Sequence, residues 1–93
     1  MNITDIRIKL LNTPKNNVYA TADVIIDNEL AIHGVKVIKT GEKTFVSMPS
    51  EKIESKNKKS YQDIVHPITQ EGREKFTKAV LEKYELVLAE SGE

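Results

Sequence analysis

The sequence predicts an α+β fold, an antiparallel β-meander of four to five strands followed by one long C-terminal helix. Apolar residues alternate with polar ones through most of residues 3–68, which is typical of half-buried strands, and the connections are too short for parallel neighbours. From Thr69 onward the apolar residues recur at helical spacing instead. We therefore expect one domain over residues 1–93, with strands in about 3–68, the helix in about 69–89 and a frayed tail at 90–93.

The first two strands follow from this alternation. In residues 3–11, Ile6, Ile8 and Leu10 share one face, and charged residues occupy the other. Residues 12–17 contain Pro14 and several asparagines, so they are expected to form a turn. The second strand, residues 18–27, has small and branched apolar side chains at its even positions. This pattern predicts that the even positions face the core and that Tyr19 faces outward.

The third strand, residues 30–39, is expected to pair with the second through a tight turn at Asp27 and Asn28. Asparagine tolerates the positive φ that a two-residue hairpin turn requires. Within this strand, the apolar residues before and after Gly34 have opposite parity. This change of parity predicts a β-bulge at Gly34.

Two short strands, residues 44–48 and 61–65, are expected to flank a lysine-rich loop. Pro49 and Pro67 follow them closely, and proline excludes a central ladder position, so both strands should stop before these prolines. The loop between them contains Lys56, Lys58 and Lys59, the only concentrated group of basic residues in the chain.

The C-terminal helix is expected to begin at the N-cap Thr69 and to place Phe76, Val80 and Tyr84 against the sheet. On its opposite face, Glu and Lys alternate at i,i+4 spacing, which is typical of a solvated, nearly neutral surface. Leu81 and Leu88 lie off the predicted core stripe. They form either the flank of a wide core face or part of a subunit contact.

Composition limits the possible functions. The chain has 14 basic and 14 acidic residues, so its formal net charge is zero. It has no cysteine, and this absence excludes thiolate metal sites, disulfides and a cysteine nucleophile. His33 and His66 are isolated in the sequence, so no metal site or cofactor is expected, and each should have an ordinary hydrogen-bond partner. Neither an apolar leader nor a membrane span is present in the sequence, so a cytoplasmic protein without a membrane partner is expected.

Catalytic motifs are not indicated by the sequence. Asp63, His66 and a serine at 47 or 50 have the residue types of a catalytic triad, but 63 and 66 would point to opposite faces of a continuing strand. The four glycines are scattered singly, so the sequence contains no glycine-rich phosphate loop. We therefore expect no enzymatic activity and no small-molecule substrate.

Several stretches together resemble the stage V sporulation protein G family. They are Ile3-Thr4-Asp5-Ile6-Arg7, Val35-Lys36-Val37-Ile38, Phe45-Val46-Ser47-Met48-Pro49-Ser50, Asp63-Ile64-Val65-His66-Pro67-Ile68, and the helix with Arg73, Ala79-Val80-Leu81 and Tyr84. The resemblance extends over nearly the whole chain. It implies a bacterial cytoplasmic homodimer that is linked to septation, sporulation and gene regulation, and that binds DNA and RNA with modest sequence preference.

The basic residues of the family pattern are only partly present. The family places them directly after Met-Pro-Ser and before Asp-Ile, and here Glu51, Lys52 and Gln62 occupy the matching positions, so only Lys52 is retained. A longer loop replaces the family's short turn and supplies three lysines. The predicted nucleic-acid-binding residues are Lys52, Lys56, Lys58 and Lys59 for phosphates and Tyr61 for stacking on a base.

A second hypothesis belongs to another functional class. The protein would act as a protein-interaction module in cell division or sporulation, through an exposed sheet edge or the Leu81 and Leu88 strip, without contacting nucleic acid. We also expect a two-fold dimer that uses a sheet edge plus part of the helix, because one helix on a thin sheet leaves edge strands that natural proteins usually pair or cover.

Overall fold

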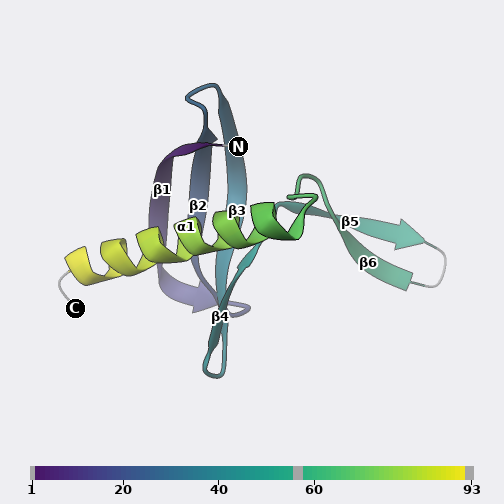
Figure 1. Cartoon of the computed structure of the whole chain (residues 1–93). Coiled ribbons are helices and arrows are strands. Elements are labelled where there is room, and N and C mark those ends of the chain that lie inside the picture. The colour runs from purple at the N-terminus through teal and green to yellow at the C-terminus, as the bar shows by residue number, and fades with distance from the viewer. Residues whose placement is uncertain (1, 56–57, 92–93) are drawn as a thin grey trace.

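The computed structural model describes residues 2–55 and 58–91, with the backbone alone for residues 55, 58 and 59. The elements in chain order are β1 (Ile3–Lys15), β2 (Val18–Ile26), β3 (Leu30–Thr40), β4 (Lys43–Ser47), β5 (Ser50–Ser55), β6 (Lys58–Asp63) and α1 (Gln70–Glu90). Strands β1 to β4 form one antiparallel sheet in the order β1-β2-β3-β4, and β5 pairs with β6 separately (Figure 1). The predicted α+β class, the meander and the C-terminal helix are confirmed.

Residues in the left-handed region form the tight turns of the meander. Asp27 and Asn28 have φ values of 54° and 55°, as the sequence predicts for the β2–β3 hairpin. The preceding turn is shorter than expected, because β1 continues to Lys15 and only Asn16 and Asn17 have positive φ. Pro14 is tolerated within β1 because β1 is an edge strand, where a missing N–H leaves no central ladder bond unmade.

Gly34 forms the predicted bulge in β3. Its φ is 84°, and the register changes there, because Ala22 pairs with Val35 whereas Val24 pairs with Ile32. The extra residue in β3 lets Ile32 and Val35 both face the core despite their opposite parity. The bulge therefore keeps one continuous apolar face on the sheet.

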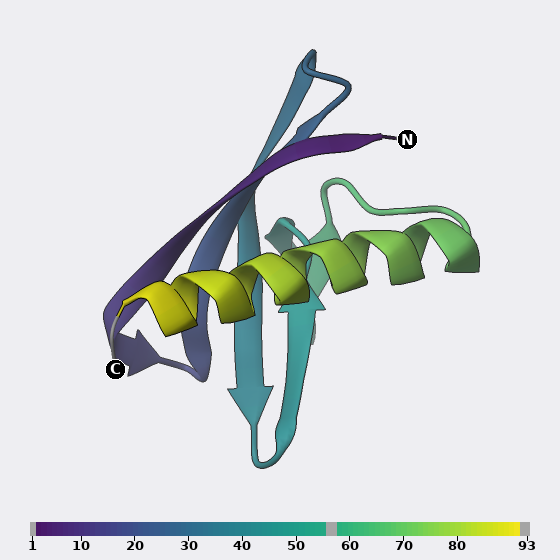
Figure 2. The same ribbon diagram turned by 60° about the vertical axis from the view of Figure 1, so that its left-hand side comes forward.

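The helix α1 crosses one face of the sheet (Figure 2). Thr69 is its N-cap, and the Thr69 hydroxyl accepts a hydrogen bond from the Gly72 amide at 3.0 Å, as predicted. Phe76, Val80 and Tyr84 are the buried residues of the helix. Leu81 is partly buried against the same core, whereas Leu88 remains exposed. Leu81 therefore belongs to the flank of the core face.

Tyr19 differs from its predicted outward position. The Lys39 ammonium lies 5.2 Å from the centre of the Tyr19 ring and 5.3 Å from the centre of the Tyr84 ring. Tyr84 is one of the residues of α1 that are buried in the core. Tyr19 therefore contributes to the helix side of the sheet. A register shift between Val18 and Ala20 is the physical reason, because it breaks the simple alternation at the start of β2.

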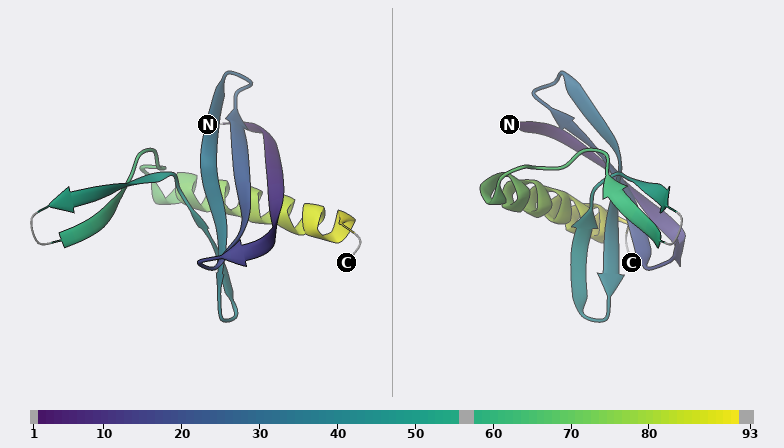
Figure 3. Two further views of the ribbon diagram at one scale, coloured as in Figure 1. Left: turned by 180° about the vertical axis from the view of Figure 1, so that it is seen from behind. Right: turned by 90° about the vertical axis from the view of Figure 1, so that its right-hand side faces the viewer.

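The largest correction concerns residues 50–63. As predicted, β4 ends before Pro49, but the expected loop is mostly strand. The strand expected at 61–65 is present with other bounds, because β6 begins at Lys58 and ends at Asp63. β5 and β6 form a hairpin that projects away from the four-stranded sheet (Figure 3). We call this hairpin, residues 50–63, the arm. A backbone hydrogen bond of 2.8 Å from Ile64 to Pro49 closes its base.

Candidate nucleic-acid interface

The predicted phosphate-binding residues all belong to the arm. Lys52 lies in β5, directly opposite Tyr61 in β6. The backbones of Lys58 and Lys59 pair with Ser55 and Glu54, and Lys56 lies outside the described residues. One projecting hairpin therefore holds the four predicted residues that the structure describes, Lys52, Lys58, Lys59 and Tyr61. Its formal charge is +1, from four lysines against two glutamates and one aspartate.

Lys52 has an acidic neighbour on its own strand. Its ammonium lies 3.6 Å from a carboxylate oxygen of Glu54, and the two side chains are 44% and 69% exposed to solvent. An exposed ion pair of this kind contributes little free energy, so a phosphate group can compete with Glu54 for the lysine. Glu54 therefore does not prevent Lys52 from contacting a phosphate.

Tyr61 is the single aromatic residue in the sequence of the arm, and 74% of its surface is accessible. An aromatic ring in that position leaves most of its apolar surface in contact with solvent. Base–aromatic stacking is tolerant of sequence because every base has a π face, so an exposed ring on a projecting hairpin suits unpaired nucleotides. The geometry is thus compatible with the stacking role predicted for Tyr61.

A shallow polar hollow of about 340 Å³ lies at the base of the arm. Its lining residues are Tyr61, Gln62, Asp63, His66 and Arg73. Arg73, from the first turns of α1, donates a hydrogen bond of 3.4 Å to the Pro67 carbonyl. The hollow therefore combines an aromatic ring, a carboxylate, an imidazole and a guanidinium from three segments of the chain.

No binding role for Arg73 or His66 is predicted from sequence patterns, because their approach to Tyr61 depends on how the start of α1 meets the arm. His66 was expected to have an ordinary partner, and its Nδ1 lies 2.9 Å from the Pro67 carbonyl oxygen. His33 likewise has a partner, with Nδ1 2.9 Å from Asp23 Oδ1. Ser47, a possible triad member by residue type, points its hydroxyl to the Met48 carbonyl at 3.5 Å. Each of these three side chains therefore has a hydrogen-bond partner within the chain.

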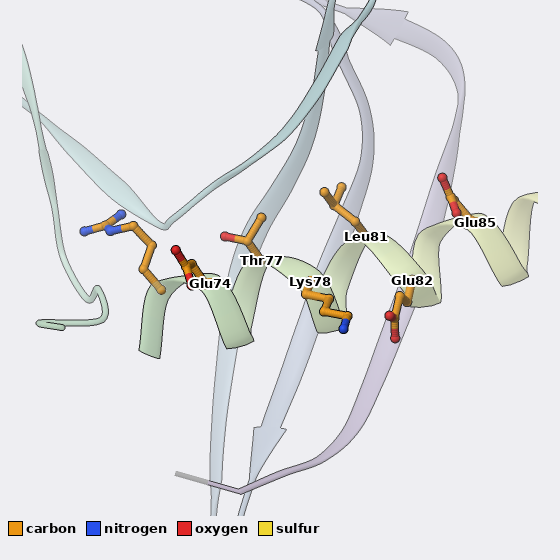
Figure 4. A pocket seen from close by; sticks show the side chains of 7 residues that line it. Glu74, Thr77, Lys78, Leu81, Glu82 and Glu85 are labelled. Carbon is orange, nitrogen blue, oxygen red and sulfur yellow. The ribbon is translucent and has the colours of Figure 1, made fainter. Parts of the chain in front are cut away.

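A larger hollow, of about 610 Å³, lies along α1 and has different chemistry (Figure 4). Its lining residues are Arg73, Glu74, Thr77, Lys78, Leu81, Glu82 and Glu85. Lys78 and Glu82 lie on one side of the helix, and Thr77, Leu81 and Glu85 on another (Figure 4). Its three carboxylates outnumber its two cationic groups, so the net charge of this surface does not favour a phosphate backbone. No helix in the described part of the chain is long and apolar enough to cross a membrane.

Comparison with known proteins gives a consistent result. The family model described as SpoVG matches residues 1–86. A protein of Finegoldia magna named "Putative septation protein SpoVG" is 48% identical over 84 residues, which cover 90% of this chain and 74% of that protein. Proteins of the same name are 39% identical over 93 residues in Acetivibrio thermocellus, with 100% and 95% coverage, and 38% identical over 91 residues in Clostridium novyi, with 98% and 87% coverage.

Proposed function

The chain belongs to the SpoVG family, and we propose that it acts in septation and sporulation as a cytoplasmic, dimeric protein that binds DNA and RNA and regulates gene expression. Lys52, Lys56, Lys58 and Lys59 contact phosphates, and Tyr61 stacks on a base. The observation that carries this proposal is the projecting arm, whose described strands hold Lys52, Lys58, Lys59 and Tyr61. A hairpin that stands away from the core can reach a nucleic acid without disturbing the fold.

The charges on the arm set the expected strength of binding. Lysine provides a point charge and lacks the two-pronged geometry of arginine, so lysine contacts carry little information about sequence. Glu51 and Glu54 lie near Lys52 on β5 and reduce the local potential. We therefore expect modest affinity, weak sequence preference and strong dependence on salt.

A mobility-shift titration tests this function. The wild-type protein should shift both duplex DNA and single-stranded RNA at about 50 mM salt, and the affinity should fall steeply at about 200 mM, because each phosphate contact releases counterions. A protein that binds neither nucleic acid at the lower salt contradicts the proposal. That result would favour the alternative function, an interaction module that acts through its exposed edge strands.

The proposed dimer uses the β4 edge of the sheet. The strand order leaves β1 and β4 as edges, and β4 has only five residues. Phe45, at the centre of β4, is 43% exposed and pairs with Ile38 of β3. Antiparallel pairing of β4 with β4 of a second copy would provide partners for the backbone N–H and C=O groups at this edge. It would also place the two Phe45 rings side by side.

Sedimentation velocity tests this assembly. The wild-type protein should sediment as a dimer at micromolar concentration, and Phe45→Glu should shift it toward monomer, because two carboxylates would then meet across the two-fold axis. Leu30→Glu is the matched control, since Leu30 is also an exposed apolar residue but lies next to the β2–β3 turn. A wild-type protein that remains monomeric, or a Phe45→Glu dimer as stable as the wild type, contradicts this arrangement.

A further inference from the structure

The polar hollow at the base of the arm has more kinds of functional group than contacts with phosphates require. Lysines alone would suffice for contacts with the nucleic-acid backbone. Here an exposed aromatic ring is joined by hydrogen-bond acceptors and a guanidinium within the same hollow. Such a combination is typical of sites that hold an unpaired base.

Tyr61 and Asp63 share one face of the arm because they are two residues apart in β6. Both are exposed, and among the described residues neither side chain has a hydrogen-bond or ion-pair partner. A base that stacks on the Tyr61 ring would therefore bring its polar edge toward a carboxylate with free acceptor sites. The carboxylate is unsuited to a phosphate, which it would repel.

His66 adds a second acceptor to the hollow. Its Nδ1 lies 2.9 Å from the Pro67 carbonyl oxygen, which can only accept, so in the neutral ring Nδ1 carries the proton and Nε2 is left as an acceptor. The hollow thus offers acceptors to the edge of a base. Guanine presents two adjacent donors on its pairing edge, whereas uracil presents one N–H between two carbonyl oxygens.

Arg73 supplies the donor side of the same hollow. One of its Nη atoms donates to the Pro67 carbonyl at 3.4 Å, which uses one of the five N–H groups of the guanidinium. The remaining N–H groups can contact a phosphate in two-pronged fashion. Arg73 is therefore placed to hold the phosphate of the nucleotide whose base lies on Tyr61.

We propose that the hollow at the base of the arm binds one unpaired guanine of a single-stranded nucleic acid. The base stacks on Tyr61, its donors meet Asp63 and His66, and Arg73 contacts the adjoining phosphate. A base within a duplex exposes its edges but not its face, so this site selects single strands. The inference rests on the proposed nucleic-acid binding and adds to it a base preference that lysine contacts cannot provide.

Fluorescence anisotropy with labelled RNA octamers tests this site. The probes are octauridine and the same octamer with one central guanosine. The wild type should bind the guanosine-containing octamer at least about fivefold more tightly. Asp63→Asn should reduce this ratio to within about twofold, because an amide presents a donor where the guanine edge needs an acceptor. Tyr61→Ala should weaken binding of the guanosine octamer by roughly 5- to 100-fold, and Tyr61→Phe, which keeps the ring, should not.

Lys52→Gln separates this site from the phosphate contacts. It should weaken both octamers equally and leave the guanosine preference unchanged, because it removes a charge and no contact with a base. If the wild type binds RNA without preferring guanosine, or if Asp63→Asn keeps the preference, the guanine site is wrong while the proposed function stands. If neither octamer nor duplex DNA binds, both are wrong. Circular dichroism of each variant checks that the helix remains folded.

Discussion

Phe76→Ala should destabilise the protein by about 3 to 5 kcal/mol, the usual cost of removing a buried phenylalanine. Phe76 is 2% exposed and belongs to the core between α1 and the sheet. It also lines a small apolar hollow of about 160 Å³ that includes Ile32 and Met48, so truncation would enlarge an existing gap. A domain of this size has a total stability of roughly 5 to 14 kcal/mol, and the loss is therefore a large share of it.

Urea unfolding followed by circular dichroism, at one fixed protein concentration, measures this effect. The matched control is Leu86→Ala, on the same helix but with Leu86 59% exposed, which should change stability by no more than about 1 kcal/mol. A Phe76→Ala variant whose stability lies within about 1 kcal/mol of the wild type would mean that the helix does not anchor the core as described.

The parts of the fold that the sequence predicted well are those that bury an apolar face. Alternation defined β2 and β3, the change of parity located the bulge at Gly34, and helical spacing identified Phe76, Val80 and Tyr84. Burial makes these patterns obligatory, because a shift of one residue would turn a whole apolar face to water. Local chemistry was equally informative at the Thr69 cap and at the Asp27 and Asn28 turn.

The arm was missed because, among its residues 50–54 and 60–63, only Ile53 is even partly buried. Within residues 50–63, Ile53 is the only aliphatic residue and polar residues occupy both faces, so no period of two marks the strands. Its pairing is fixed by backbone ladder bonds and the closing contact between Ile64 and Pro49, neither of which has a composition signature.

The candidate site was predicted only in part. Lys52 and Tyr61 were predicted from charge, residue type and family resemblance, because both lie near the basic stretch of the sequence. The approach of Arg73 to Tyr61 depends on the tertiary arrangement of α1 and the arm, which no local pattern encodes. Tyr19 was misplaced for a related reason, since a register shift at Val18 overrides alternation.

The second large effect concerns the four lysines of the arm. Replacing Lys52, Lys56, Lys58 and Lys59 by Gln should flatten the dependence of log affinity on log salt concentration for duplex DNA. Each phosphate contact contributes about 0.9 to that slope. Two subunits could lose up to roughly eight contacts, and if about half of these form, the slope should change by about 3 to 4. Gln keeps the length of the side chain, so the hairpin and the core should be little affected.

The matched control replaces Lys75 and Lys78 of α1 by Gln. These residues lie on a helix face that also carries Glu71, Glu74 and Glu82, so their loss should leave the affinity and the salt slope nearly unchanged. Both variants should sediment as folded dimers like the wild type.

The salt slope of the arm variant, measured on duplex DNA between about 50 and 200 mM salt, is the most direct test of nucleic-acid binding through the arm. We predict a slope smaller than that of the wild type by about 3 to 4, and a wild-type slope for the helix variant. An arm variant that remains a folded dimer and binds DNA with unaltered affinity and slope would contradict the proposal that the arm contacts phosphates.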